Sequence, residues 1–451
     1  MNLKIDKEFY KRLFSVAVPI ALHGIITASL TLLDNLMVNQ LGETQLASVG
    51  LATQCFSLEW LVIFGFCSGC ATFYTQFWGI KDVRNIKKVI GIALMTCFCV
   101  GLVFFIAGFF FPVQVLNLFT DSPEAALLGA EYLKAASINF ILVGLTQPIM
   151  YAMLSTEQTK IPLYVSMASF FVDLSFNYLL IFGKLGFPKL GLRGAAIATV
   201  LARFLEFVIA MILLFGKKNI LSGKLSEYFS FNLEYAKRVY KNAIFTCMHE
   251  TLWSLAMTAQ TAAYGHMSIS SFAAIQATAT VMDIFQFAGY SIGDASLIFV
   301  GECLGRNEIE EAKATSKKLA KVCFTFGCIL ALIVIALRKP ILSLFKLSDL
   351  GFYYARRLIL VRCFYLPFYL LVVLMVSGVL RAGGDTRFAA ITELSCMWLW
   401  LVPAAFFFGM YLQLPIYIVL LITNIEEIIK IIIVLVRYKS GKWLKNMIKG
   451  M

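Results

Sequence analysis

Residues 32–52 read LLDNLMVNQLGETQLASVGLA and join two long apolar stretches, which we place at 13–40 and 47–77. A helix that spans a bilayer needs about 20 mostly apolar residues. Polar backbone groups in lipid must be satisfied within the helix, so stretches of this length predict spanning helices rather than strands. The short polar junction between them indicates a turn at the membrane surface.

The same pattern continues along the chain. Of 451 residues, 60% are apolar and 14% are charged, whereas soluble domains have about 45–50% and about 25%. The class predicted is an all-α integral membrane protein of about twelve transmembrane helices. Ten further spans follow the first two, at approximately 89–113, 125–153, 161–183, 194–216, 238–264, 270–301, 315–337, 352–380, 388–410 and 413–436.

The formal charge of +13 has a topological explanation. Lysines and arginines gather at the N-terminus, the even-numbered connections and the C-terminus, whereas few lie on the opposite side, Lys184 and Lys189 among them. This bias is the positive-inside rule. It predicts a multi-pass protein of the inner (plasma) membrane with both termini in the cytoplasm, and it argues against a nucleic-acid partner.

The least hydrophobic connection divides the chain nearly in half. It carries Lys217 and Lys218, and we interpret 217–237 as a cytoplasmic loop. Residues 1–216 would then form an N-terminal six-helix lobe. Residues 238–451 would form a C-terminal six-helix lobe with a short basic cytoplasmic tail.

The two halves also resemble each other. An offset of 226 aligns Gln76 with Glu302 and Gly79 with Gly305. Because six spans per half is an even number, the lobes should be parallel, pseudo-symmetric repeats around a central cavity that holds the substrate. Both glycines stand where a helix runs into a polar loop, so we expect left-handed caps there.

Four ordered motifs resemble one family of transporters. They are the junction 32–52, TQFWGIKD (75–82), FGKLGFPKLGLRGAAIATVLA (182–202) and the tail GKWLK (441–445). Together they resemble the multidrug and toxic compound extrusion (MATE) family. The resemblance implies a secondary active efflux antiporter that works by alternating access. It would export amphipathic, cationic small molecules in exchange for protons or sodium ions.

Charged groups inside spans are costly and therefore candidates for function. Asp34 lies near the outer end of the first span, where the family's aspartate is implicated in cation coupling. Asp173 and Asn177, four residues apart, share a helix face, although the family usually has asparagine at the first of these positions. Thr199 matches a family threonine and would complete this proton- or cation-binding cluster, unless its hydroxyl bonds to its own helix.

The second lobe offers another candidate. Glu250 matches a family glutamate that binds the coupling cation, although a glutamate near the start of this helix could instead reach toward the cytoplasm. The stretch 364–380 lacks the acid that would partner it in a sodium site, which favours protons. We assign Gln147 and Asp294 to the substrate cavity. Pro19 removes a backbone hydrogen bond and is the expected hinge of the first helix.

Three other functions fit the sequence less well than a MATE-like transporter. A major facilitator type transporter lacks counterparts of the motifs, and a lipid-linked saccharide flippase would have a more basic cavity. An enzyme would need a converging cluster of catalytic or metal-binding groups. His23, His249 and His266 stand at unrelated depths, so we expect no enzyme and no cofactor.

The sequence makes no prediction about a metal site. The expected partners are an organic cation, a proton or sodium ion and the bilayer, with the chain as a monomer.

Overall fold

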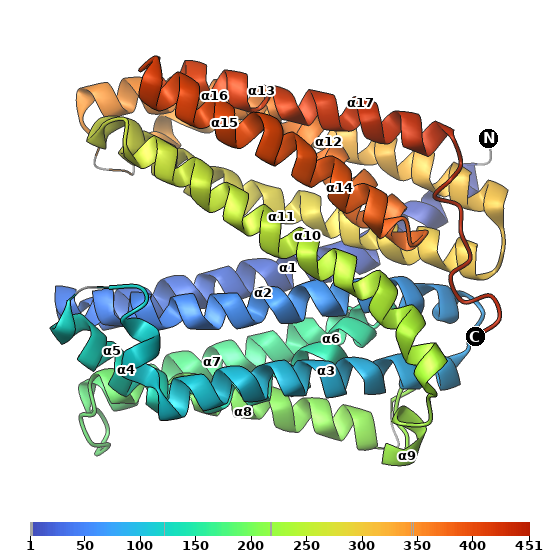
Figure 1. Ribbon diagram of the computed structural model, residues 1–451, viewed down its shortest axis with the longest axis horizontal. Helices are drawn as coiled ribbons and strands as arrows, with labels where there is room; N and C mark the ends of the chain where they lie inside the picture. Colours follow the sequence, from blue (N-terminus) through green and yellow to red (C-terminus); the bar gives the residue numbers. More distant parts are fainter. Residues whose placement is uncertain (1–2, 121, 217–218, 344, 346) are drawn as a thin grey trace. The chain divides into compact units, whose positions relative to one another are not determined.

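The computed structural model describes residues 3–120, 122–216, 219–343, 345 and 347–451, and every regular element in these ranges is helical (Figure 1). The first half contains α1 (Leu3–Asn39), α2 (Glu43–Gly79), α3 (Val83–Phe110), α4 (Pro112–Leu116), α5 (Pro123–Ala136), α6 (Ile138–Ser155), α7 (Lys160–Phe182) and α8 (Leu192–Phe215). Lys217 and Lys218 of the predicted loop lie outside the described residues.

The second half begins with the short helix α9. Its elements are α9 (Leu225–Tyr228), α10 (Leu233–Gly265), α11 (Ile269–Gly305), α12 (Ile309–Leu342), α13 (Asp349–Val373), η1 (Leu374–Leu380), α14 (Thr386–Cys396), η2 (Met397–Leu401), α15 (Val402–Phe406), η3 (Phe407–Tyr411), α16 (Ile416–Thr423) and α17 (Ile425–Lys439). The three η segments are π-helical turns within longer helices.

The predicted class of an all-α membrane protein is confirmed. Nine helices in the described ranges are long and apolar enough to cross a membrane, and a tenth is α11, bent by 46°. The helix α10 and the α16–α17 pair complete the twelve. The spans predicted at 125–153 and 413–436 are each divided in two, at Ser137 and at Asn424, both of which keep a right-handed helical backbone.

The chain folds into two compact units. Unit 1 comprises Met1–Ala21, Thr75–Ile80 and Ile244–Met451, and unit 2 comprises Leu22–Tyr74 and Lys81–Ala243. The helix α1 therefore passes from one unit to the other two residues after Pro19. The sequence did not indicate that the beginning of α1 and the end of α2 would belong with the C-terminal helices.

Small residues set the packing of unit 2, in which α7 packs on α8 and α3 on α6. Gly194 opens α8, and a Cβ added there would lie 2.6 Å from the backbone of Leu180 on α7. Ala195, Ala196 and Ala198 on the same helix are buried. The close approach of α7 and α8 brings the polar face of α7 against α8, where the candidate site lies.

The prediction of left-handed caps at Gly79 and Gly305 is wrong. The left-handed residues are Lys81, with φ 58°, and Asn307, with φ 62°, two positions further on in each repeat. The glycines are needed for contact instead. A Cβ on Gly79 would lie 2.3 Å from the carbonyl oxygen of Glu302, and one on Gly305 would lie 2.0 Å from that of Gln76. The contact is reciprocal under the 226-residue offset, as expected for a duplicated half.

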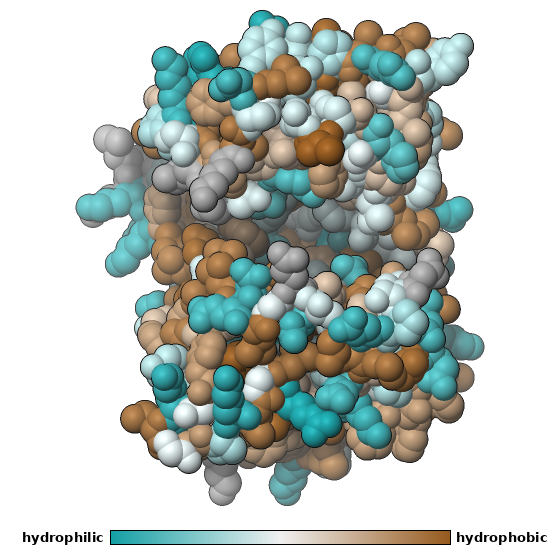
Figure 2. Space-filling model, turned by 90° about the vertical axis from the view of Figure 1, so that its left-hand side faces the viewer, coloured by the Kyte–Doolittle hydropathy of each residue, from teal (hydrophilic) through white to brown (hydrophobic). Residues whose placement is uncertain are grey.

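The last residues fold back on unit 1. Trp443 is fully buried and stacks on Tyr438, with ring centroids 5.3 Å apart. Gln76 of α2 donates to the carbonyl oxygens of Ala382 and Lys445, at 2.7 and 3.1 Å. The start of α1 and this tail lie at the same end of the unit's helices (Figure 1). The face drawn in Figure 2, the left-hand side of Figure 1, shows polar side chains among apolar ones.

Asp385 should stabilise this tail in a pH-dependent way. Its carboxylate accepts hydrogen bonds from Arg437 at 2.7 and 2.9 Å and from Lys445 at 3.1 Å. Burial opposes ionisation of Asp385, but these partners outweigh it and hold the pKa of the carboxyl below its usual range. Because the carboxyl is more acidic in the folded protein, its ion pairs stabilise the fold at every pH above the pKa of an unfolded aspartate, about 3.9. This stabilisation is lost as the pH falls through the pKa of the folded state.

Asp385→Asn should therefore cost about 1–3 kcal/mol at neutral pH and much less at strongly acidic pH. The measurement is the unfolding midpoint of the purified protein in detergent across a pH series. Glu310→Gln is the matched control, because the Glu310 side chain is 85% exposed. A difference between wild type and Asp385→Asn that does not shrink on acidification would contradict the role of the charge.

Candidate functional site

One amide joins the two predicted carboxylates of unit 2. The Asn177 side chain donates to Asp34 Oδ1 at 2.8 Å and to Asp173 Oδ2 at 2.7 Å, both from Nδ2. The two carboxylate oxygens are therefore within two hydrogen-bond lengths of each other. Asp34, Asp173 and Asn177 therefore lie together, and their role in binding a proton or cation stays a prediction.

The local sequence explains this geometry. Asp173 and Asn177 are one helical turn apart on α7 and are 0% and 2% exposed. Asp34 is half-buried in the part of α1 that belongs to unit 2. With the acid at the first of these positions and the amide at the second, the amide lies in the middle, with one carboxylate on either side of it.

Other polar groups of unit 2 surround this cluster. Thr199 of α8 lies beside Tyr132 and Asp173, and its hydroxyl donates to the carbonyl oxygen of Ala195 at 3.1 Å. Thr199 therefore lies beside the cluster and at the same time donates its hydroxyl to its own helix, so both alternatives considered from the sequence are realised. Arg203, one turn further along α8, forms an ion pair with Glu206, three residues on, at 2.8 Å.

The charges of this cluster do not balance. Asp34, Asp173 and Glu206 all interact with the single guanidinium of Arg203. Glu59 of α2 is 1% exposed and is also within electrostatic range of Arg203. Burying a carboxylate without a paired cation is strongly unfavourable. Because the acids outnumber the nearby bases, the arrangement is suited to binding protons.

Unit 1 has its own buried network around Glu250. The carboxylate of Glu250 lies 3.0 Å from Arg381 Nη2 and 3.4 Å from His249 Nδ1. The other imidazole nitrogen of His249 lies 2.7 Å from Glu393 of α14. Glu250 is therefore neither an isolated carboxylate nor one that reaches to the cytoplasm, contrary to the expectation from the stretch 364–380. Its partner is a base, Arg381, which follows that stretch directly.

The remaining candidates are not brought into these clusters. Gln147 is half-buried on α6 of unit 2, and Asp294 is exposed on α11 of unit 1. Because the two residues belong to different units, the shared substrate cavity stays a prediction. Pro19 lies inside α1, as predicted.

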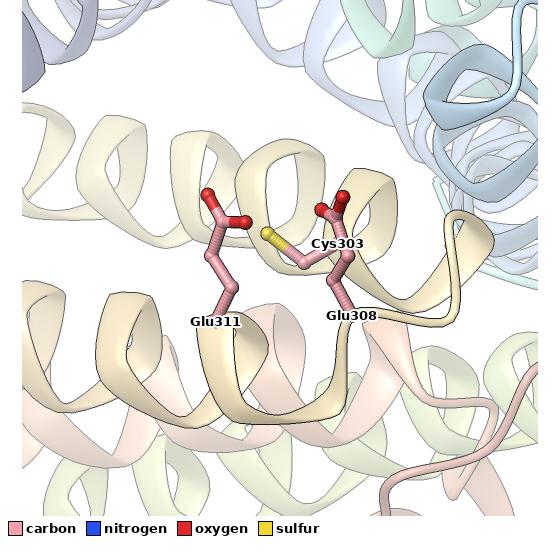
Figure 3. Close-up of side chains that lie close together, drawn as sticks. All are labelled: Cys303, Glu308 and Glu311. Atoms are coloured by element: carbon pink, nitrogen blue, oxygen red, sulfur yellow. The ribbon is translucent and has the colours of Figure 1, made fainter.

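A group of possible metal ligands lies at the α11–α12 turn. Cys303 on α11 and Glu308 and Glu311 near the start of α12 point toward one another (Figure 3), with ligand atoms within 4.8 Å. Arg306 supplies the positive charge here, 2.6 Å from Glu308 and 4.0 Å from Glu311. Arg306 therefore acts as a counter-ion to this group, and the acids and the arginine form an ion-pair network at the turn.

Sequence reasoning missed several charged residues of unit 1. Lys430 lies 3.2 Å from both Glu426 and Glu427, and all three are buried on α17. The spacing of three and four residues inside the last apolar span could have revealed them. No comparable sequence signal links Arg381 to Glu250, because 131 residues separate them.

The comparisons with known proteins agree on one family. The MatE family model matches residues 19–179 and 243–407. The chain is 25% identical over 404 residues to the probable multidrug resistance protein YoeA of Bacillus subtilis, covering 88% of this chain and 87% of the relative. It is 23% identical over 447 residues to the uncharacterized transporter YisQ of the same organism, covering 99% and 96%.

The fold has a close match among solved structures. A MOP superfamily transporter from Pyrococcus furiosus aligns with a TM-score of 0.84 and 16% identity, covering 96% of both chains. The match of the MatE model to most of the chain decides against a major facilitator protein and a saccharide flippase, and it confirms that the protein is not an enzyme. The chain belongs to the MATE family of membrane transporters.

Proposed function

We propose that this protein exports amphipathic organic cations across the plasma membrane in exchange for protons. The observation that carries the proposal is the Asn177 amide, which holds Asp34 and Asp173 side by side. Repulsion between two carboxylates this close makes it unfavourable for both to be charged, and burial further disfavours the charged form. The pair therefore takes up a proton readily and gives it up when a positive charge arrives.

Exchange requires that proton and substrate favour different states of the transporter. Protonation of the pair relieves the repulsion between Asp34 and Asp173. Because Asp34 stands on α1, the change acts on the helix that passes from unit 1 to unit 2 close to Pro19. Bending there would move the outer part of α1 and weaken substrate binding. An organic cation would favour the charged pair and the straight helix.

The donor set favours protons over sodium ions. Sodium needs several oxygen ligands at once, whereas the Asn177 side chain turns its NH2 group, a donor, toward both carboxylates. In unit 1, Glu250 is already bound by Arg381 and His249. Neither arrangement presents a cage of free oxygen atoms, so the proton is the better-supported coupling ion.

The substrate class follows from charge and from related proteins. Asp294 and Asp283 are both exposed on α11, and exposed carboxylates attract cations. The name of the similar YoeA protein describes a probable multidrug resistance protein. Aromatic side chains make up 14% of this chain and can bind organic cations through their ring faces. We infer a preference for flat, apolar cations.

Transport by purified protein in lipid vesicles tests this function. With ethidium as the probe, an imposed pH gradient should drive accumulation on the acidic side, whereas a sodium gradient alone should not. Protein-free vesicles give the background. Accumulation driven by sodium after the pH gradient has been collapsed would overturn the proton assignment.

The orientation of the chain gives a separate prediction. If the basic connections face the cytoplasm, a cysteine replacing Leu185 should be labelled from outside, and one replacing Glu310 only from inside. Leu185 is 88% exposed between α7 and α8, and the Glu310 side chain is 85% exposed in the first turn of α12. The measurement is labelling of whole cells by an impermeant maleimide in a cysteine-free background. Outside labelling of Glu310→Cys alone would reverse the topology.

A further inference from the structure

Three charged side chains lie buried near the start of α17 in unit 1. Glu426, Glu427 and Lys430 are 2%, 7% and 2% exposed. Spacings of three and four residues place the lysine beside both glutamates on one helix face. The helix packs against α13 and α14, so these charges are held inside the protein rather than at its surface.

Lys430 pairs with one oxygen of each glutamate, and the second oxygen of each has no partner among the described residues. Lys430 Nζ lies 3.2 Å from Oε1 of Glu426 and 3.2 Å from Oε1 of Glu427. Oε2 of both glutamates is buried and has no hydrogen-bond partner among the described residues. Buried carboxylate oxygens are nearly always paired, so this pattern points to something further bound there.

Among the described residues, the neighbouring helices contribute no ion pair to Glu426 or Glu427. The nearest further acid is Glu393 of α14, whose partner is His249 of α10 at 2.7 Å. Arg381 is bound to Glu250 at 3.0 Å. The other titratable groups within electrostatic range are Cys396 of α14, Tyr264 of α10, Tyr290 of α11 and Tyr369 of α13. These groups are neutral in their ordinary form, and they can add no cation.

Arg362 of α13 is a more distant cation. It lies within electrostatic range of Tyr264 and Asp283, but within the described part of the chain it forms no ion pair with either glutamate of α17. The positive end of the α17 dipole favours negative charge in its first turn. That effect is a partial charge at a helix end, and it does not replace a full counter-charge for a buried carboxylate.

We propose that Glu426 and Glu427 bind one proton between them, so that the start of α17 is a proton-binding site of unit 1 separate from the Asp34 pair. With both glutamates ionised, the trio carries an uncompensated negative charge. A neutral lysine would make the imbalance worse. One shared proton leaves a single carboxylate opposite Lys430 and supplies a donor for the unpaired oxygens. The site takes a proton and does not depend on which ion drives transport.

Infrared difference spectroscopy of the full-length purified protein tests this directly. The carbonyl stretch of a protonated carboxyl group shifts on transfer to deuterated buffer, and its area counts such groups. Glu426→Gln and Glu427→Gln should each remove one protonated carboxyl at neutral pH, because the remaining glutamate then pairs with Lys430. Lys430→Gln should add one. The exposed control Glu310→Gln should change nothing.

The same losses should appear in an Asp34→Asn background, which separates this site from that of unit 2. Loss in only one of the two glutamine variants would overturn the sharing of the proton, and loss in neither would show both glutamates to be charged. A failure of proton-driven transport would leave these band areas unaffected, so the two proposals are tested apart.

Discussion

Asp34→Asn is expected to reduce pH-driven efflux to the level of protein-free vesicles while the protein still folds and inserts. Asparagine has nearly the same shape as a protonated aspartate but cannot release a proton. The hydrogen bond from Asn177 to Oδ1 can be kept, so the structural cost is small. The lost property is the alternation between charged and neutral forms, on which exchange depends. The measurement is initial ethidium uptake under an imposed pH gradient.

Two variants control for this result. Glu124→Gln removes an exposed carboxylate of unit 2 outside the cluster and should leave uptake unchanged. The double change Asp173→Asn and Asn177→Asp keeps an acid and an amide on the same face of α7 and should retain substantial uptake. Wild-type uptake by Asp34→Asn, with the same pH dependence, would move the coupling to other residues.

Arg381→Met is expected to destabilise the protein by about 3–5 kcal/mol, the usual cost of removing one partner of a buried ion pair. Arg381 is 5% exposed and lies 3.0 Å from Glu250. Its removal leaves the Glu250 carboxylate with only His249 beside it. Unfolding of the purified protein in detergent measures the loss.

The double variant Arg381→Met with Glu250→Gln should recover much of this loss, because both charges then disappear together. Arg387→Met is the matched control, since Arg387 is an exposed arginine in the first turn of α14, two residues after Asp385. It should change the unfolding free energy by no more than about 0.5 kcal/mol. If Arg381→Met were equally mild, Arg381 would not be the counter-charge of Glu250.

Short-range patterns predicted most of the fold and half of the candidate site. Apolar runs of spanning length predict helices because each helix satisfies its own backbone. The four-residue spacing of Asp173 and Asn177 predicted their shared face, and Asp34 was found through the motif that resembles the family. The reciprocal contact of Gly79 and Gly305 agrees with the duplication, although its physical reason is packing rather than backbone conformation.

The rest depends on tertiary contacts that leave no periodic signal. Arg381 meets Glu250 across 131 positions, and Gln76 holds the tail across more than 360. The division of α1 between the two units also depends on how whole helices pack. Of these missed contacts, sequence spacing could have predicted only the Glu426–Glu427–Lys430 group, because its three members lie on one helix.

Proton release on substrate binding tests the central claim most directly. Ethidium is added to the purified protein in weakly buffered detergent solution, and a pH indicator records the protons set free. The account predicts that wild type releases one proton more than Asp34→Asn, because the cation replaces the proton held by Asp34 and Asp173. Equal release by the two proteins, at matched ethidium binding, would contradict it.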